Sequence, residues 1–240
     1  MITIVLASAL SMANVIVVTA TEGYRHESIE TAEEVVAEIG RDTGWFVPRF
    51  VRSEEELSTA MTPAALAETK LVMFVNTTGE LEWPERARLL EWVAAGGAFF
   101  GVHSAADTWH QWPEYLDMLG AEFAGHPPES EVEVVVDDWF HPSTRHMTAP
   151  HRVVEEIYFF DRFSRDRVKM LLSLRVAPDD GRPGFFPLAW HRRHGRGLVL
   201  YTALGHRIDV WQSEWFRLHL QGAIEAALAQ PSRRRRAVGR

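Results

Sequence analysis

The chain has 240 residues, 46% hydrophobic and 24% charged, a composition typical of a folded globular protein long enough for one large domain. Its formal net charge of −8 argues against general binding to nucleic acid or to an anionic membrane surface. It contains no cysteine, which excludes disulfides, thiolate metal ligands and a cysteine nucleophile.

The two ends of the chain differ in composition from the rest. Residues 1–13 are apolar but lack a basic start, so we treat them as a leader of uncertain status, with Met12 as an alternative first residue. A weak export signal stays open, and we expect a cytoplasmic protein. Residues 14–230 are predicted to form a single domain, and residues 231–240 a basic, disordered tail. No stretch reaches the roughly 18 apolar residues of a membrane span.

Short β-branched and aromatic runs alternate with helical patterns, which predicts βαβ units around a mostly parallel sheet. The predicted strands are residues 15–18, 45–51, 71–75, 98–102, 131–138, 153–160, 168–174, 186–193 and 197–203. A helix over residues 29–39 is expected to start at Ser28 and end near Gly40, and another runs from Pro84 through residue 95. Ser213 is predicted to cap the final helix. Pro48 places the second strand at an edge of the sheet.

Polar clusters follow four of these strands: TEGYRHES, NTTGE, HSAAD and LGHRID. Because the carboxyl ends of parallel strands meet at one edge of a sheet, we expect these loops to form one site. The candidate residues at this edge are Glu22, His26, Asn76, Thr77, Thr78, His103, Ser104, Asp107, His206 and Asp209. The alternative for the threonines and Asp209 is a purely local role in turns.

His103 and Asp107 are four residues apart, so at the start of a helix they would face each other. A carboxylate that fixes the tautomer of an imidazole is common in general acid–base catalysis. Ser104 is either a helix cap or a nucleophile, and His126 is either a site residue or a loop histidine. Five aromatic residues either belong to the core or form a stacking surface for a sugar ring: Trp109, Trp112, Tyr158, Trp190 and Trp211.

A metal site is not expected from the histidine spacing. The chain has no H-E-x-x-H pattern, and His191 and His194 do not share one helical face. We therefore predict no metal ligands and no cofactor. A metal-dependent hydrolase using a His–Asp pair stays open as a minor alternative.

Several motifs together resemble the ThuA-like, or trehalose-utilisation, family over roughly residues 14–228: VVTATEGYRHESI, NTTGEL, GGAFFGVHSAADT, LGAEFAGHP and PLAWHRRHGRGLVLYTALGH. The resemblance implies a flavodoxin-like three-layer α/β/α sandwich of the class I glutamine-amidotransferase-like type. In those amidotransferases a G-x-C-x-G elbow follows the fourth strand. His103 occupies the cysteine position here, so no glutamine amidotransferase activity is expected.

The resemblance also implies a role in the catabolism of trehalose or a related disaccharide, with keto-sugar intermediates. It implies the catalytic residues His103, Asp107, His26 and His206. The substrate-binding residues it implies are Thr77, Thr78, Ser104 and His126; the strand-end position of Glu22 and the aromatic ring of Trp109 add these two residues to the predicted binding set. We expect an enzyme of the sugar isomerase, epimerase, lyase or hydrolase type that uses histidine acid–base chemistry. Its partner is a small sugar, with no nucleic acid and no membrane, and a homo-oligomer is left open. The alternative is a non-catalytic carbohydrate-binding or regulatory module using the same pocket.

Overall fold

The computed structural model describes residues 12–231, so the leader residues 1–11 and the tail residues 232–240 lie outside the described part of the chain. The strands are β1 (Ala13–Val18), β2 (Phe46–Val51), β3 (Thr69–Val75), β4 (Ala98–Val102), β5 (Glu122–Gly125), β6 (Ser130–Val136), β7 (His151–Glu155), β8 (Phe159–Asp161), β9 (Lys169–Val176), β10 (Pro183–His194) and β11 (Gly197–Thr202). The α-helices are α1 (Ile29–Thr43), α2 (Glu54–Ala60), α3 (Pro63–Glu68), α4 (Ala87–Ala94), α5 (Pro113–Leu119), α6 (Ile208–Gln212) and α7 (Glu214–Leu228). The 3-10 helices are η1 (His103–Asp107) and η2 (Arg165–Arg167).

Nine of the described strands form one sheet in the order β2-β1-β3-β4-β11-β10-β9-β6-β7, and β5 pairs with β8 in a separate ribbon. The strands from β2 to β11 in this order are parallel, as predicted, and β2 lies at the edge. Beyond β11 the sheet continues with antiparallel strands. All parallel strands end at the same edge of the sheet.

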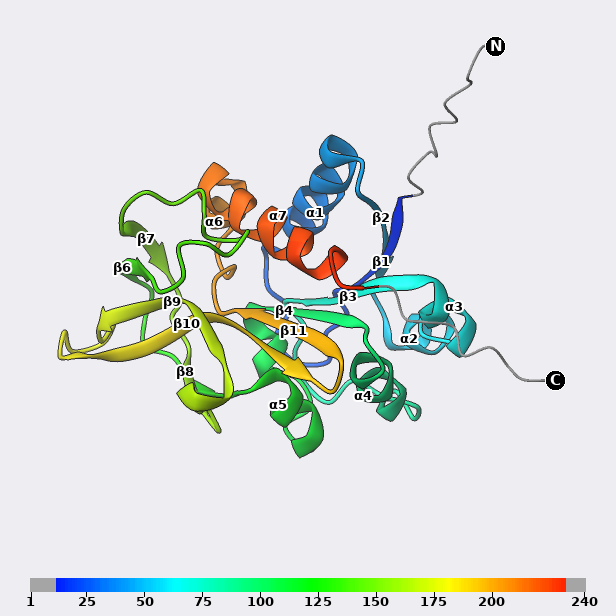
Figure 1. Ribbon diagram of the computed structural model, residues 1–240. Coiled ribbons are helices and arrows are strands. Elements are labelled where there is room, and N and C mark those ends of the chain that lie inside the picture. The colour runs from blue at the N-terminus through cyan, green and yellow to red at the C-terminus, as the bar shows by residue number, and fades with distance from the viewer. Residues whose placement is uncertain (1–11, 232–240) are drawn as a thin grey trace, which may run out of the picture.

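Helices cover both faces of the parallel strands, which gives the predicted three-layer α/β/α sandwich. Helices α1, α6 and α7 lie on one face, and α4 and α5 lie on the other (Figure 1). Within residues 12–231, every helix is too short or too polar to cross a lipid bilayer.

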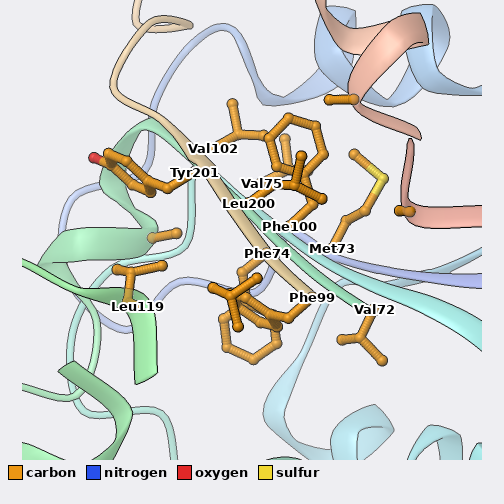
Figure 2. Packing of buried hydrophobic residues seen from close by; sticks show 14 of the residues in the cluster. Val72, Met73, Phe74, Val75, Phe99, Phe100, Val102, Leu119, Leu200 and Tyr201 are labelled. Atoms are coloured by element: carbon orange, nitrogen blue, oxygen red, sulfur yellow. The ribbon is translucent and has the colours of Figure 1, made fainter. Parts of the chain in front are cut away.

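The core explains why the parallel strands are apolar along their whole length. Alternate side chains of neighbouring strands point to opposite helical layers: Met73 and Phe100 to one, Phe74 and Phe99 to the other (Figure 2). These four side chains are at most 1% exposed, and the Phe74 and Phe99 ring centroids are 5.2 Å apart. Burying each side chain of this size contributes about 1.5–3 kcal/mol, so this double-sided packing holds the strand ends in fixed positions.

The helix boundaries differ from the prediction at two ends. Helix α1 continues past Gly40, and Gly44, with a φ of 66°, forms its left-handed cap. Gly40 is instead a packing position, where a Cβ would lie 2.9 Å from the Phe46 carbonyl oxygen. Helix α4 starts at Ala87, after a turn that contains Pro84. The predicted cap of α7 is confirmed, since the Ser213 hydroxyl accepts the Phe216 N–H.

The predicted single strand over residues 153–160 is wrong. It divides into β7, which belongs to the large sheet, and β8, which pairs with β5. The chain leaves strand geometry at residues 156–158, between the two. Glu156 and Tyr158 lie in this break, so both side chains are released from the alternation of a strand. The break faces the edge where the parallel strands end.

Candidate active site

His103 is at the centre of the predicted edge. It follows β4 directly and begins η1 with a φ of 50°, in the left-handed region that costs a non-glycine residue on the order of 1 kcal/mol. A sharp turn from strand to helix is the form of a nucleophile elbow. Here the turn presents an imidazole, and that side chain is fully buried.

The contacts of His103 fix its ring on both sides. Its Nδ1 lies 2.8 Å from the carbonyl oxygen of Ala203, which can only accept, so Nδ1 carries a hydrogen and donates. Its Nε2 lies 3.4 Å from Glu156 Oε2 and 3.3 Å from His206 Nδ1. The Tyr158 ring packs against the imidazole, with centroids 4.3 Å apart. The Nε2 edge of His103 therefore faces other ionisable groups.

His206 and His26 complete the group around this edge. His206 Nδ1 lies 3.2 Å from Glu156 Oε2, and its Nε2 lies 3.3 Å from Glu129 Oε1. The His26 ring meets the His103 ring at 4.8 Å and the His206 ring at 5.2 Å between centroids. One ligand atom from each of His26, His103, His206 and Glu156 lies within 4.8 Å of the others. These four residues are called the His/Glu cluster below, and this donor set is of the kind that holds a metal ion.

Glu156 connects the His/Glu cluster to His126. Its second oxygen, Oε1, lies 3.2 Å from His126 Nδ1, and the His126 side chain is 41% exposed. Next to it, the buried Glu155 carboxylate accepts the N–H groups of Gly205 and Glu156, each at 2.9 Å. Burial raises the pKa of Glu155. This second carboxylate therefore fixes the backbone on both sides of the cluster.

Burial and mutual repulsion set the charges in the His/Glu cluster. Burial, together with His103 and His206 nearby, lowers the pKa of His26 to about 3, so its imidazole is neutral. Burial alone would raise the pKa of Glu156, but hydrogen bonds and charge interactions with His103 and His206 outweigh it and hold that pKa far below its usual range. Burial opposes the charge of His206, yet Glu156 raises its pKa overall. The cluster thus contains one carboxylate among imidazoles.

The His/Glu cluster opens to the surface through His206, whose side chain is 19% exposed. His206 lies on the wall of a cleft of about 380 Å³, within the range of small-molecule sites. The cleft is lined by Tyr24, Glu27, Ser28, Glu129, His206, Arg207, Ile208, Asp209 and Gln212. Its polar and charged walls suit a ligand that carries many hydroxyl groups.

The structure brings together His26, His103, Ser104, His126 and His206 of the predicted residues. The Ser104 hydroxyl lies 3.5 Å from His26 Nδ1 and makes no cap contact. Asp209 forms an ion pair with Arg207 at the surface and contacts neither Ser104 nor His206. Within the described residues, Ser104 therefore has no His206–Asp209 pair beside it that could activate it as a nucleophile.

Asp107 does not orient His103, and that prediction is wrong. Because η1 is a 3-10 helix with three residues per turn, His103 and Asp107, which are four residues apart, do not share a face. Asp107 instead contacts His110 Nε2 at 2.7 Å, beyond the end of η1. The carboxylate beside His103 comes from Glu156.

Trp109 is fully buried, and its indole N–H donates to the Leu81 carbonyl oxygen at 2.8 Å, so it offers no stacking surface. The other aromatics considered for stacking are also buried: Trp112, Tyr158, Trp190 and Trp211.

The remaining predicted binding residues hold loops together. The Thr77 hydroxyl bonds the Thr108 hydroxyl at 2.8 Å, and the Thr78 hydroxyl donates to the Tyr24 carbonyl oxygen at 2.8 Å. The Glu22 carboxylate accepts the Glu80 N–H at 2.7 Å. The two threonines therefore make the local loop contacts that the alternative prediction gave them. Together with Glu22 they position the loops that surround the cluster.

The fold and the site together define a class of protein: an α/β sandwich of the class I glutamine-amidotransferase-like type with an imidazole at the elbow and no thiol in the chain. The model of the ThuA family, described as trehalose utilisation, matches residues 14–227. The chain belongs to this family.

Solved structures of similar fold include two ThuA-like proteins. One, from Parabacteroides merdae, is 20% identical with a TM-score of 0.75, over 91% of this chain and 90% of that one. The other, from Bacteroides uniformis, is 22% identical with a TM-score of 0.72, over 92% and 93%. A β-galactosidase from Bacillus circulans is 15% identical with a TM-score of 0.56, over 90% of this chain and 31% of its own. No curated protein sequence matches the chain.

Sequence reasoning missed three acidic residues of the site: Glu129, Glu155 and Glu156. A signal was present, because two adjacent glutamates interrupt the otherwise apolar segment VVEEIYFF. Charged residues are rarely buried without a partner, so a charged pair inside a core segment indicates such a partner.

Proposed function

We propose that the chain is an enzyme that acts on a trehalose-related disaccharide or its keto-sugar derivative and moves a proton beside the His/Glu cluster. The observation that carries this proposal is the convergence of three imidazoles and one carboxylate, from four separate segments, of which His206 lies on the wall of a polar cleft. The family description, trehalose utilisation, supports the substrate class.

His126, which is 41% exposed and contacts Glu156 but lies outside the cleft lining, is the group to which we assign proton exchange with a sugar bound beside the cluster. Its Nδ1 lies 3.0 Å from the Pro127 carbonyl oxygen and 3.2 Å from Glu156 Oε1. Both partners accept, so Nδ1 carries the hydrogen and Nε2 keeps a lone pair that can take a proton. An imidazole oriented by a carboxylate is effective near neutral pH. The sequence assigned this work to His103, which is buried too deeply to contact a ligand in the cleft.

A keto group makes the C–H bond on the neighbouring ring carbon acidic. In the proposed step, His126 Nε2 takes this proton, and the electron pair of the C–H bond moves to give an enolate on the former carbonyl oxygen. In this step the oxygen lies against His206, the cluster residue on the cleft wall, where Glu156 raises the pKa of the imidazole and so favours a positive charge that stabilises an enolate. Return of the proton to the same carbon or its neighbour gives epimerisation or isomerisation, and loss of a leaving group from the next carbon gives elimination.

The test is proton exchange with solvent, followed by NMR in D₂O on a 3-keto-disaccharide. We expect the purified protein to exchange or convert the C–H beside the carbonyl faster than buffer alone. The variant His126→Asn should lose about 100-fold or more of this rate. The matched control is His194→Asn, since His194 is the last residue of β10 and pairs with Gly197 at the start of β11, at the opposite edge of the sheet.

A binding module would behave differently in the same experiment. If the keto sugar raises the Tm of the protein but is neither exchanged nor converted, the enzyme proposal is refuted and the chain is a carbohydrate-binding module.

A further inference from the structure

We propose that His26, His103, His206 and Glu156 bind one divalent transition-metal ion, with zinc as the first candidate. This departs from the sequence-based expectation of no metal. A metal ion at this site would deepen the proposed function. Its role in catalysis rests on that function, but the metal-binding test does not.

The spacing of the donor atoms is that of a metal site. His206 Nδ1 and Glu156 Oε2 are 3.2 Å apart, His103 Nε2 and His206 Nδ1 are 3.3 Å apart, and His103 Nε2 and Glu156 Oε2 are 3.4 Å apart. Ligands at 2.0–2.2 Å from a tetrahedral zinc ion lie roughly 3.3–3.6 Å from one another. The donor of His26 lies within 4.8 Å of the other three and completes the set.

The hydrogen bonds around His103 and His206 leave three acceptors face to face. His103 donates its Nδ1 hydrogen to the Ala203 carbonyl oxygen, so its Nε2 presents a lone pair. His206 directs Nε2 to the Glu129 carboxylate, so Nε2 holds the hydrogen and Nδ1 presents a lone pair. Glu156 Oε2 is the third acceptor. Three lone pairs that meet within about 3.4 Å, two of them on largely buried residues, repel one another unless a cation, either a metal ion or a proton, lies between them.

Each donor also has the outer partner expected around a bound metal. Metal-ligating histidines commonly donate their second N–H to a carbonyl or carboxylate, which fixes the tautomer. Ala203 and Glu129 are such partners for His103 and His206, and the Ser104 hydroxyl lies beside His26 Nδ1. The other oxygen of Glu156 contacts His126. These contacts come from loops of both halves of the sheet, so the arrangement is held by the fold.

The donor types select the class of ion. Calcium and magnesium prefer six or more oxygen ligands, whereas imidazole nitrogen suits zinc, iron, nickel and copper. Three imidazoles and one carboxylate therefore favour a divalent transition metal. Such an ion would polarise a sugar carbonyl oxygen, while His126, held by the same carboxylate, takes the proton from the neighbouring carbon.

The experiment measures metal binding without substrate. The full-length protein is stripped with a chelator and titrated with Zn²⁺, and bound metal is counted by elemental analysis after dialysis; Co²⁺ serves as a visible-absorption probe. We expect one equivalent, with affinity reduced at least 10-fold in Glu156→Gln and His206→Gln. Glu129→Gln, which removes only an outer partner, should lower the affinity about 10-fold. His194→Asn is the matched control, and circular dichroism confirms that each variant is folded.

One outcome overturns the metal site, and another overturns its part in the reaction. If Zn²⁺ fails to bind stoichiometrically, or binds equally well to the folded Glu156→Gln and His206→Gln variants, an extra proton on the cluster replaces the metal. If chelated protein turns over a keto sugar at the full rate, the metal has no part in the reaction. A protein that binds one Zn²⁺ at the cluster but converts no sugar supports the metal site and refutes only the proposed function.

Discussion

Replacing Glu155 by Gln tests how the site is held together. The Glu155 side chain is buried, and its two oxygens each accept one backbone N–H, from Gly205 and from Glu156. These two backbone positions lie beside His206 and on Glu156 itself. A glutamine has one oxygen and one NH₂ group, so in either orientation one of the two N–H groups loses its acceptor and meets a donor.

The magnitude follows from that single lost bond. A hydrogen bond to a charged group contributes about 1.5–3 kcal/mol, and an orphaned buried donor costs a similar amount. Removing the buried charge of Glu155 offsets part of this cost, since burial already opposes its ionisation. We expect Glu155→Gln to lower the free energy of unfolding by about 1–2 kcal/mol. For a chain of this length that corresponds to a fall in Tm of roughly 2–8 °C.

Thermal and urea unfolding measure the effect, with Glu133→Gln as the control. Glu133 lies on the neighbouring antiparallel strand β6 and makes only an exposed ion pair with Arg152, so its replacement should change stability by less than about 0.5 kcal/mol. A Glu155→Gln protein as stable as the Glu133→Gln protein would refute the anchoring role. Weakened Zn²⁺ binding in Glu155→Gln would show that the anchor acts on the cluster.

Two further predictions concern helix α7. Gly222→Ala would add a Cβ 2.1 Å from the Pro142 carbonyl oxygen. Alanine favours an isolated helix by about 1 kcal/mol, but we expect this clash to lower the free energy of unfolding in urea by about 1–3 kcal/mol. A stabilised variant would contradict this packing. Burial lowers the pKa of His219 from 6.5 to about 3, while its Nδ1–H donates to the Ser143 carbonyl oxygen. The unfolded chain therefore binds a proton near pH 6.5 that the folded chain binds only near pH 3. The contribution of neutral His219 to the free energy of unfolding is complete above pH 6.5 and falls as the pH drops below that value. His219→Gln keeps a donor and should remove on the order of 2 kcal/mol of the acid-induced loss at pH 4.5, measured as unfolding free energy against pH; identical pH profiles would refute it.

The parallel half of the site could be predicted from the sequence because its pattern is local. Apolar runs that end in polar loops mark the carboxyl ends of buried parallel strands, and His26, His103 and His206 all follow such runs. The absence of cysteine and the histidine at the elbow position also argue, from the sequence alone, against a cysteine-based glutaminase. These inferences need only strand periodicity and chain order.

The acidic half could not be predicted because it depends on geometry that periodicity does not encode. The spacing of His103 and Asp107 indicates contact only on an α-helix, and the left-handed start of η1 forms a 3-10 helix instead. Glu156 lies where one apparent strand changes from the large sheet to the β5–β8 ribbon, and this partner exchange is a tertiary effect. Trp109 could not be placed for the same reason, since the sequence around it does not distinguish a buried ring from an exposed one.

The connectivity of the His/Glu cluster has a consequence for biosynthesis. His206 meets His103 across 103 residues of sequence, and Ser104 meets His26 across 78. Contacts of such long range form slowly, because much of the intervening chain must be ordered first. During translation, the early strands can assemble while the last donor is still in the ribosome. The centre of the protein therefore matures at the end of folding, and a chain that terminates before residue 206 lacks one donor of the cluster.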